Sequence, residues 1–148
     1  REVSHLPPPL MQPLDATALL EDVVRFMQTE DNDLRLTPPP APLRLLADKG
    51  QVEQVLINLI KNARENEARC ITLSAGVTST GRLFLRVTGI EPEVQERIFV
   101  PFFTTKPGGS GIGLTLARQI MHQHGGSIDV RSCPGEGSIF TLLFPYNG

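Results

Sequence analysis

The stretch TTKPGGSGIGL, residues 104–114, joins a glycine-rich loop to the start of an apolar helix and is the most informative segment of the chain. Glycine lets backbone N–H groups approach an anion closely, and the N-terminus of a helix favours negative charge. Lys106 stands just before these glycines and can meet a phosphate. A flexible glycine hinge before a helix has the same composition, so the loop by itself leaves both interpretations open.

The residues around this loop exclude the two most common phosphate-binding loops. A Walker loop ends in Gly-Lys-Ser or Gly-Lys-Thr, and neither triplet follows here. A dinucleotide-binding turn follows a strand directly, whereas Phe-Phe-Thr-Thr at 102–105 precedes these glycines. Any phosphate site at this loop therefore needs support from other parts of the chain.

Hydrophobic periodicity divides the chain into helices and strands. Apolar residues at helical spacing predict three helices, one from Asp15 to near Thr29, one beginning at Asp48 and one over 111–124. Alternating apolar residues predict strands, which lie at 71–77, 83–87, 127–132 and 138–144, after two short extended pieces within 34–46. This order favours a mixed sheet covered on one face by helices.

Polar residues mark the ends of the predicted helices. Asp15 is a predicted N-cap, and Asp48 with Gln51 fits a capping box. The glycine pair 125–126 ends the third helix, as glycine does just past a helix end. His124 is a predicted capping residue at that same end, where a cation is favoured.

Length and composition narrow the class of protein. The chain has 148 residues and a net charge of −2, which suits one compact domain and argues against a nucleic-acid binder. No apolar run approaches the roughly 18 residues that cross a bilayer, and no secretory leader opens the chain. We therefore expect a cytoplasmic domain with Cys70 and Cys133 as reduced, buried thiols, while a membrane anchor in a longer parent protein stays open.

The second predicted helix carries the other candidate site. Asn58 and Asn62 lie one helical turn apart, on one face beside the apolar stripe. Asparagine is a poor residue for a helix interior, so two of them on one helix face indicate a role other than helix formation. An amide oxygen is a suitable ligand for Mg²⁺, which also binds phosphate oxygens. The alternative is a solvated helix face.

Several spaced motifs together resemble the ATP-binding catalytic domain of bacterial sensor histidine kinases. Residues 54–63, QVLINLIKNA, match the N box of that family. Residues 98–106, IFVPFFTTK, match its F box, and 109–114, GSGIGL, match its second glycine box. Residues 135–145 resemble its closing strands, so the resemblance covers about 14–148. The family belongs to the wider superfamily that includes DNA gyrase, and the Phe-Phe-Thr-Thr form is most similar to the nitrogen-regulation branch.

The resemblance implies the fold and a set of nucleotide-binding residues. The fold would be α+β, a two-layer sandwich with a mixed, mostly antiparallel five-stranded sheet covered on one face by three helices, the Bergerat-type fold. Asn62 would bind Mg²⁺, Asn58 would lie close to the phosphates, and Lys106 with the backbone of 110–114 would hold the triphosphate. The full candidate set is Asn58, Asn62, Gly89, Thr104, Thr105, Lys106, Gly109, Ser110, Gly111, Ile112, Gly113, Leu114 and Ser138.

Further expectations concern the surroundings of the nucleotide. By the same resemblance, residues 91–110 would form a mobile lid, and Ser138 would make a water-linked contact to adenine. Phe102 and Phe103 would either contact the nucleotide or anchor the lid to the core. The resemblance assigns no residue of this chain a certain catalytic role.

The first glycine box of the family is where this sequence departs from the pattern. The family has Asp-x-Gly-x-Gly after a strand, and its Asp accepts a hydrogen bond from the adenine amino group. Here Val87 and Thr88 lead directly to Gly89, which fits only the end of that box. Either a short loop bearing the Asp has been removed from this sequence, or the protein has lost adenine recognition.

The sequence therefore predicts the ATP- and Mg²⁺-binding catalytic domain of a two-component sensor histidine kinase over 14–148, after a linker at 1–13 from a dimerisation hairpin. None of His5, His122 and His124 lies in the family's acceptor motif, so the phosphate would pass to a histidine on that separate dimerisation domain. A response regulator would act downstream, and the fragment would be monomeric and inactive alone. The alternative is a degenerate interaction module that does not bind ATP.

Overall fold

The computed structural model describes residues 6–65, 68–90, 100–101, 110–133 and 137–146. Its helices are α1 (Ala16–Met27), α2 (Lys49–Glu65) and α3 (Ser110–Gln123). Its strands are β1 (Gln12–Asp15), β2 (Leu34–Thr37), β3 (Arg44–Ala47), β4 (Cys70–Val77), β5 (Leu83–Ile90), β6 (Val100–Pro101), β7 (Ser127–Cys133) and β8 (Gly137–Phe144). No helix of the described segments is long and apolar enough to cross a membrane.

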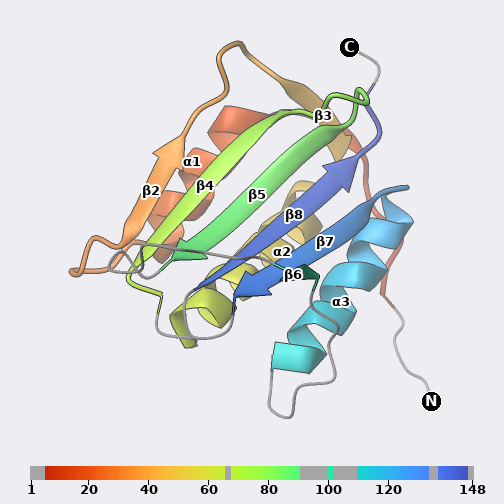
Figure 1. The fold of residues 1–148 in the computed structure, drawn as a ribbon. Coiled ribbons are helices and arrows are strands. Elements are labelled where there is room, and N and C mark those ends of the chain that lie inside the picture. Colours follow the sequence, from red (N-terminus) through yellow and green to blue (C-terminus); the bar gives the residue numbers. More distant parts are fainter. Residues whose placement is uncertain (1–5, 66–67, 91–99, 102–109, 134–136, 147–148) are drawn as a thin grey trace.

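The main sheet has the strand order β2-β4-β5-β8-β7-β6, and the three helices lie on one of its faces (Figure 1). Strand β2 pairs in parallel with β4, and every other neighbouring pair in this sheet is antiparallel. The five longer strands thus form the mixed sheet of the predicted α+β sandwich, which is confirmed. The two-residue β6 extends its edge, and β1 pairs with β3 in a separate ribbon.

The core lies between the sheet and the helices. Alternate residues of β5 and β8 point toward the helices and are buried, as the period of a strand requires. The buried residues of α2 are the ones that its periodicity predicts, namely Val52, Val55, Leu56, Leu59, Ile60 and Ala63. Each fully buried Val, Leu or Ile side chain contributes on the order of 2 kcal/mol, so this apolar face fixes α2 against the sheet.

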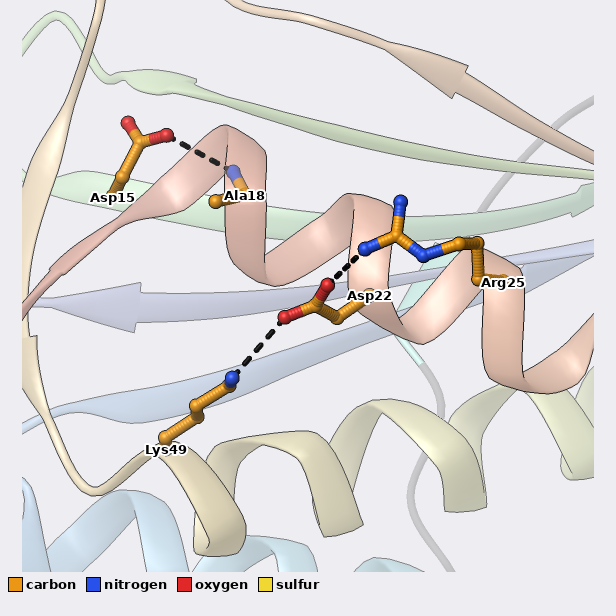
Figure 2. A network of polar contacts seen from close by, with 5 residues as sticks. All are labelled: Asp15, Ala18, Asp22, Arg25 and Lys49. Carbon is orange, nitrogen blue, oxygen red and sulfur yellow. Dashed lines mark hydrogen bonds and ion pairs between the residues drawn. The ribbon is translucent and has the colours of Figure 1, made fainter.

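Helix α1 begins at its predicted cap. The Asp15 carboxylate accepts a hydrogen bond from the backbone N–H of Ala18 at 3.1 Å (Figure 2). Farther along α1, Asp22 pairs with Arg25 on the same helix and with Lys49 at the start of α2, at 3.1 Å from the lysine Nζ. The hydrogen bond from Lys49 lowers the pKa of Asp22. Arg25 and Lys49 are exposed and Asp22 is only partly buried, so these ion pairs add little stability. They lie where α1 and α2 meet.

The end of α3 is a Schellman motif at the predicted glycine pair. Gly125 has a φ of 74°, in the left-handed region that favours glycine. The N–H of Gly126 donates to the carbonyl of Met121 at 2.9 Å, and that of Gly125 to His122 at 3.0 Å. A Cβ at Gly126 would lie 2.0 Å from the carbonyl oxygen of Leu143, so only glycine lets β7 start this close to β8.

The predicted capping box at Asp48 forms only in part. One carboxylate oxygen of Asp48 accepts from the N–H of Gln51 at 3.0 Å, as expected. The Gln51 side chain does not reach back to the N–H of Asp48 and donates instead to the carbonyl of Pro7 at 2.9 Å. The imidazole of His124 accepts from that N–H at 3.0 Å, because α3 packs beside α2 and brings its end there.

The two cysteines do not pair. Cys70 is free and half-buried. Cys70, Ile90, Gly137 and Cys133 follow one another across the neighbouring strands β4, β5, β8 and β7. Three strand spacings separate the two cysteine backbones by about 14 Å, which is beyond the reach of a disulfide.

An ion pair fixes the far end of α2. The guanidinium of Arg64 donates two hydrogen bonds to the carboxylate of Asp33, at 2.9 and 2.8 Å, and a third to the carbonyl of Met27 at 2.8 Å. The side chains of Arg64 and Asp33 are only 25% and 13% exposed. The hydrogen bonds from Arg64 hold the pKa of Asp33 below its ordinary value of 3.8. This pair joins the end of α2 to the segment between α1 and β2.

Replacing Asp33 should make the stability of the protein less dependent on acid. Because the folded pKa of Asp33 is lowered, its contribution is complete above the unfolded pKa and is lost as pH falls through the folded pKa. We expect Asp33→Asn to lower the free energy of unfolding by about 2 kcal/mol at neutral pH and by much less near pH 3. Urea unfolding at both pH values measures this difference.

Glu30→Gln is the matched control, because Glu30 is exposed and lies in the same segment. Its free energy of unfolding should follow that of the original protein at both pH values. An Asp33→Asn deficit of equal size at neutral pH and near pH 3 would contradict the assigned role of the ion pair.

Candidate functional site

The amides of Asn58 and Asn62 lie on α2 beside its buried stripe. Both residues are half-buried, while Leu59 and Ala63, next to them in the sequence, are in the core. The Gln54 Nε2 donates to the Oδ1 of Asn58 at 3.1 Å, one helical turn earlier. This contact orients the Asn58 amide so that its NH₂ group is the part left to meet a ligand. Gln54 was not among the predicted site residues, although its spacing of four from Asn58 was a usable signal.

Gly89 lies within β5 and forms the floor beneath the last turns of α2. It is opposite Ile71 of β4 and Ser138 of β8. A Cβ at Gly89 would come within 2.9 Å of the Ala63 Cβ and 3.0 Å of the Ala68 Cβ. Glycine is therefore required here by the close approach of α2 to the sheet. Since Ala63 follows Asn62 in the sequence, this contact sets the height of Asn62 above the strand.

Ser138 lies on the same cross-strand row and on the helix-facing side of the sheet. It is opposite Gly89 and lies two residues before the buried Phe140, so the two side chains share one face of β8. Ser138 is half-buried, at the start of β8 where β5 ends. The structure thus brings the α2 turn of Asn62, Gly89 and Ser138 to one end of the sheet, while their roles in binding stay predictions.

Helix α3 starts at the same end of the molecule. The bond between Asp48 at the start of α2 and His124 at the end of α3 means that the two helices run in opposite directions. The last turn of α2 and the first turn of α3 consequently lie at the same end of the helical layer (Figure 1). Helix α3 begins at Ser110, and Leu114 in its second turn is buried. Because the N–H groups of a helix point toward its first residue, those of the first turn are directed toward the end that carries Asn62.

Some predicted residues lie outside the described part of the chain. These are Thr104, Thr105, Lys106 and Gly109, together with Phe102 and Phe103 and most of the predicted lid. For Ser110, Gly111, Ile112 and Gly113 the structure describes only that they belong to α3. Their predicted roles therefore stay predictions.

Strand β5 continues without a loop through the place of the first glycine box. Thr88, Gly89 and Ile90 pair with Thr72, Ile71 and Cys70 of β4, and on the other side with residues 137–139 of β8. A loop between Val87 and Gly89 would interrupt both ladders. The departure seen in the sequence is therefore also a structural one, and it lies next to Ser138.

The described groups at this end of the sheet suit a nucleotide with a divalent cation. The amide of Asn62 is a hard oxygen ligand of the kind that Mg²⁺ accepts, and Mg²⁺ keeps several waters or phosphate oxygens besides. A helix N-terminus supplies donors and favourable partial charge for phosphate. The Asn62 amide on α2 and the N-terminus of α3 lie at the same end of the helical layer, because the two helices are antiparallel.

The chain matches a known protein-family model. The family model described as "Histidine kinase-, DNA gyrase B-, and HSP90-like ATPase" matches residues 47–148. The match begins just before α2 and includes every predicted site residue. It does not include α1 or the segment before it.

Among curated relatives, the sensor histidine kinase ZraS of Salmonella typhi is 40% identical over 135 residues, which are 87% of this chain and 29% of that protein. The chain therefore spans less than a third of the length of this relative. Among solved structures, the catalytic domain of histidine kinase ThkA has a TM-score of 0.65 at 28% identity, covering 91% of this chain and 95% of that one. Full-length ShkA in complex with AMPPNP has a TM-score of 0.72 at 24% identity, covering 97% of this chain and 32% of that one.

Adding a methyl group at Gly89 should disturb the floor of the site. We expect Gly89→Ala to lower the free energy of unfolding by about 2 kcal/mol, because its Cβ would press against Ala63 and Ala68. Urea unfolding measures this change. Gly50→Ala is the control, because the nearest atom to a Cβ there is at 3.6 Å, and its effect should stay within about 0.5 kcal/mol.

A double-mutant cycle with Ala63→Gly tests the contact itself. Ala63→Gly alone should cost about 1 kcal/mol as a glycine in a helix interior. Combined with Gly89→Ala it should cost about 1 kcal/mol less than the sum of the two, since the clash with the Ala63 Cβ is removed. Strictly additive effects would show that Ala63 does not set the distance between α2 and β5.

Proposed function

Because the chain belongs to the histidine kinase-, DNA gyrase B- and HSP90-like ATPase family, we propose that it is the ATP-binding catalytic domain of a two-component sensor histidine kinase. The observation that carries this proposal is the placement of Asn62, Gly89 and Ser138 at the end of the sheet where α3 begins. The names of the curated relatives support the kinase class within the family.

In this proposal each candidate residue has a part in binding the nucleotide or its Mg²⁺. Asn62 holds Mg²⁺, and Asn58, oriented by Gln54, lies close to the phosphates. The backbone of 110–114 and Lys106 hold the triphosphate, and Ser138 makes a water-linked contact to adenine. Mg²⁺ supplies charge neutralisation on the phosphates, which is most of what phosphoryl transfer asks of a protein besides positioning. Thr104, Thr105 and Gly109 complete the phosphate side.

The remaining parts of the proposal concern the whole protein. Residues 14–148 form the catalytic domain and 1–13 a linker from a dimerisation domain, whose histidine receives the γ-phosphate. A response regulator acts downstream, and this domain alone is a cytoplasmic monomer that cannot autophosphorylate. We keep the nitrogen-regulation branch as part of the proposal, on the basis of the Phe-Phe-Thr-Thr sequence at 102–105.

A second candidate function rests on the continuous strand β5. A site built to hydrogen-bond a polar group discriminates strongly by it, so a chain without the adenine-binding Asp would bind ATP weakly. Such a domain would act as a degenerate interaction module with the same fold. Binding experiments with the nucleotide separate the two functions.

Isothermal calorimetry at millimolar ATP with Mg²⁺ tests the proposal. We expect binding that weakens when Mg²⁺ is chelated, because the cation links Asn62 to the phosphates. In Asn62→Ala the Mg²⁺-dependent part of the affinity should fall at least about tenfold. Glu53→Gln is the control, since Glu53 lies on the opposite side of α2 from Asn62, and it should bind like the original protein.

Two outcomes would overturn this proposal in different ways. The absence of heat and of any thermal shift at millimolar nucleotide would favour the degenerate module. An Asn62→Ala variant that still responds to Mg²⁺ like the original protein would remove Asn62 from the cation site.

A further inference from the structure

Asp48 connects three parts of the chain just before α2. One of its carboxylate oxygens accepts from the N–H of Gln51 in the first turn of α2, at 3.0 Å. The other accepts from the N–H of Leu10 in the proline-rich lead-in, at 2.8 Å. Its own N–H donates to the Nε2 of His124 at the end of α3, at 3.0 Å. These bonds from backbone N–H groups lower the pKa of Asp48, so its carboxylate stays charged at neutral pH.

His124 uses both nitrogens of its ring in this arrangement. The residue is only 4% exposed, and its ring meets that of Phe144 edge-on, with centroids 6.2 Å apart. The Nδ1 lies 2.8 Å from the carbonyl oxygen of Ile120 and must donate to it. The Nε2 must then be unprotonated, because it accepts from Asp48. The contacts therefore select one neutral tautomer, with the proton on Nδ1.

The Asp48–His124 hydrogen bond joins two helices that are far apart in the sequence. Helix α2 is already held at its other end by the Ala63–Gly89 contact and the Arg64–Asp33 ion pair. Helix α3 packs through its own buried residues, among them Ala117, Ile120 and Met121. The bond to His124 joins the start of α2 to the end of this packed helix, so it bears on the angle between the two helices. Helix α3 runs about 21 Å from His124 to Ser110, so a tilt of about 3° at His124 would move its first turn by about 1 Å.

The lead-in is attached at the same place. Gln51 donates to the carbonyl of Pro7, and Asp48 accepts from Leu10, so both polar groups bind the backbone of one proline-rich segment. The Oε1 of Gln51 is buried and has no hydrogen-bond partner among the described residues. Burying an amide oxygen without a partner costs free energy. The bond from the Gln51 Nε2 to Pro7 therefore indicates that the attachment of the lead-in matters for the local arrangement.

We propose that Asp48 and His124 are positioning residues, here named the Asp48–His124 joint, which hold the first turn of α3 at a fixed distance from Asn58 and Asn62. The use of that distance for nucleotide binding rests on the proposed function above. The distance itself is a property of the fold and can be measured without any nucleotide. A residue that only stabilised the helix ends would leave it unchanged.

The tautomer of His124 gives the first test. Long-range ¹H–¹⁵N spectra of the side chains should show His124 protonated on Nδ1 and unprotonated on Nε2 at neutral pH. His122 is the internal control, because it is exposed in the same last turn of α3 and should show the Nε2-protonated form that dominates in water. An Nε2-protonated His124 would overturn the joint, since it could not accept from Asp48.

Spin labels across the two helices give the second test. Labels at Lys61→Cys and Arg118→Cys, both exposed positions, are introduced with Cys70 and Cys133 replaced by serine. The distance distribution should be narrow in the parent and clearly broader in His124→Leu. His124→Gln should restore it, because the glutamine oxygen can take the place of Nε2 as acceptor. His122→Leu, the control in the same turn, should leave it narrow.

Affinity for ATP with Mg²⁺ in the same variants connects the joint to the proposed site. We expect His124→Leu to bind about tenfold more weakly, and His124→Gln to recover most of that loss. A broadened distance with no nucleotide binding even in the parent would support the joint and refute the proposed function. A narrow distance in a folded His124→Leu would refute the joint, whatever its affinity.

Discussion

Helix α2 approaches the sheet so closely that the strand beneath it has room for no side chain at Gly89, where a Cβ would press on Ala63 and Ala68. This contact fixes the height of the helix over β5. Its buried stripe then faces the sheet, and its polar edge with Asn58 and Asn62 lies at the margin of the core. The order of the strands brings Ser138 to the same place. The candidate site is a consequence of this one packing distance.

Stability and function use different sides of the same helix. Asparagine is a poor helix former, and an isolated helix of this length is marginal in water. The six buried residues of α2 supply the free energy that holds Asn58 and Asn62 in a helix. Polar contacts at the two ends, through Asp48 and through Arg64, then fix the direction of the helix rather than its existence. Because the buried stripe supplies the stability, the half-buried amides of Asn58 and Asn62 are not needed to stabilise the helix.

The continuous strand β5 distinguishes the two sides of the proposed nucleotide site. On the helix side, the last turns of α2 with Asn58 and Asn62 and the start of α3 lie at one end of the helical layer, inside the residues that the family model matches. On the sheet side, pairing with β4 and β8 runs through Ile90 and leaves no loop after Val87. In the proposed function, contacts to phosphate and Mg²⁺ then carry most of the affinity. Hydrogen bonds to charged groups are the stronger kind, so this imbalance is physically reasonable.

The sequence by itself determined the elements whose signals are local. The cap at Asp15, the buried stripe of α2 and the glycine end of α3 depend on residues within one or two helical turns, and all three were predicted correctly. The spacing of Asn58 and Asn62 identified the polar edge for the same reason.

Only the tertiary structure decided the contacts between distant segments. The bond from Asp48 goes to a residue 76 positions away, and the Arg64–Asp33 pair spans 31 positions. Local sequence predicted a complete capping box at Asp48, of which only the Asp48–Gln51 half forms, and a simple helix end at His124. A local pattern cannot encode which helices lie side by side. The need for glycine at position 89 arises in the same way. Helix α2 lies earlier in the sequence and packs against β5 at this position.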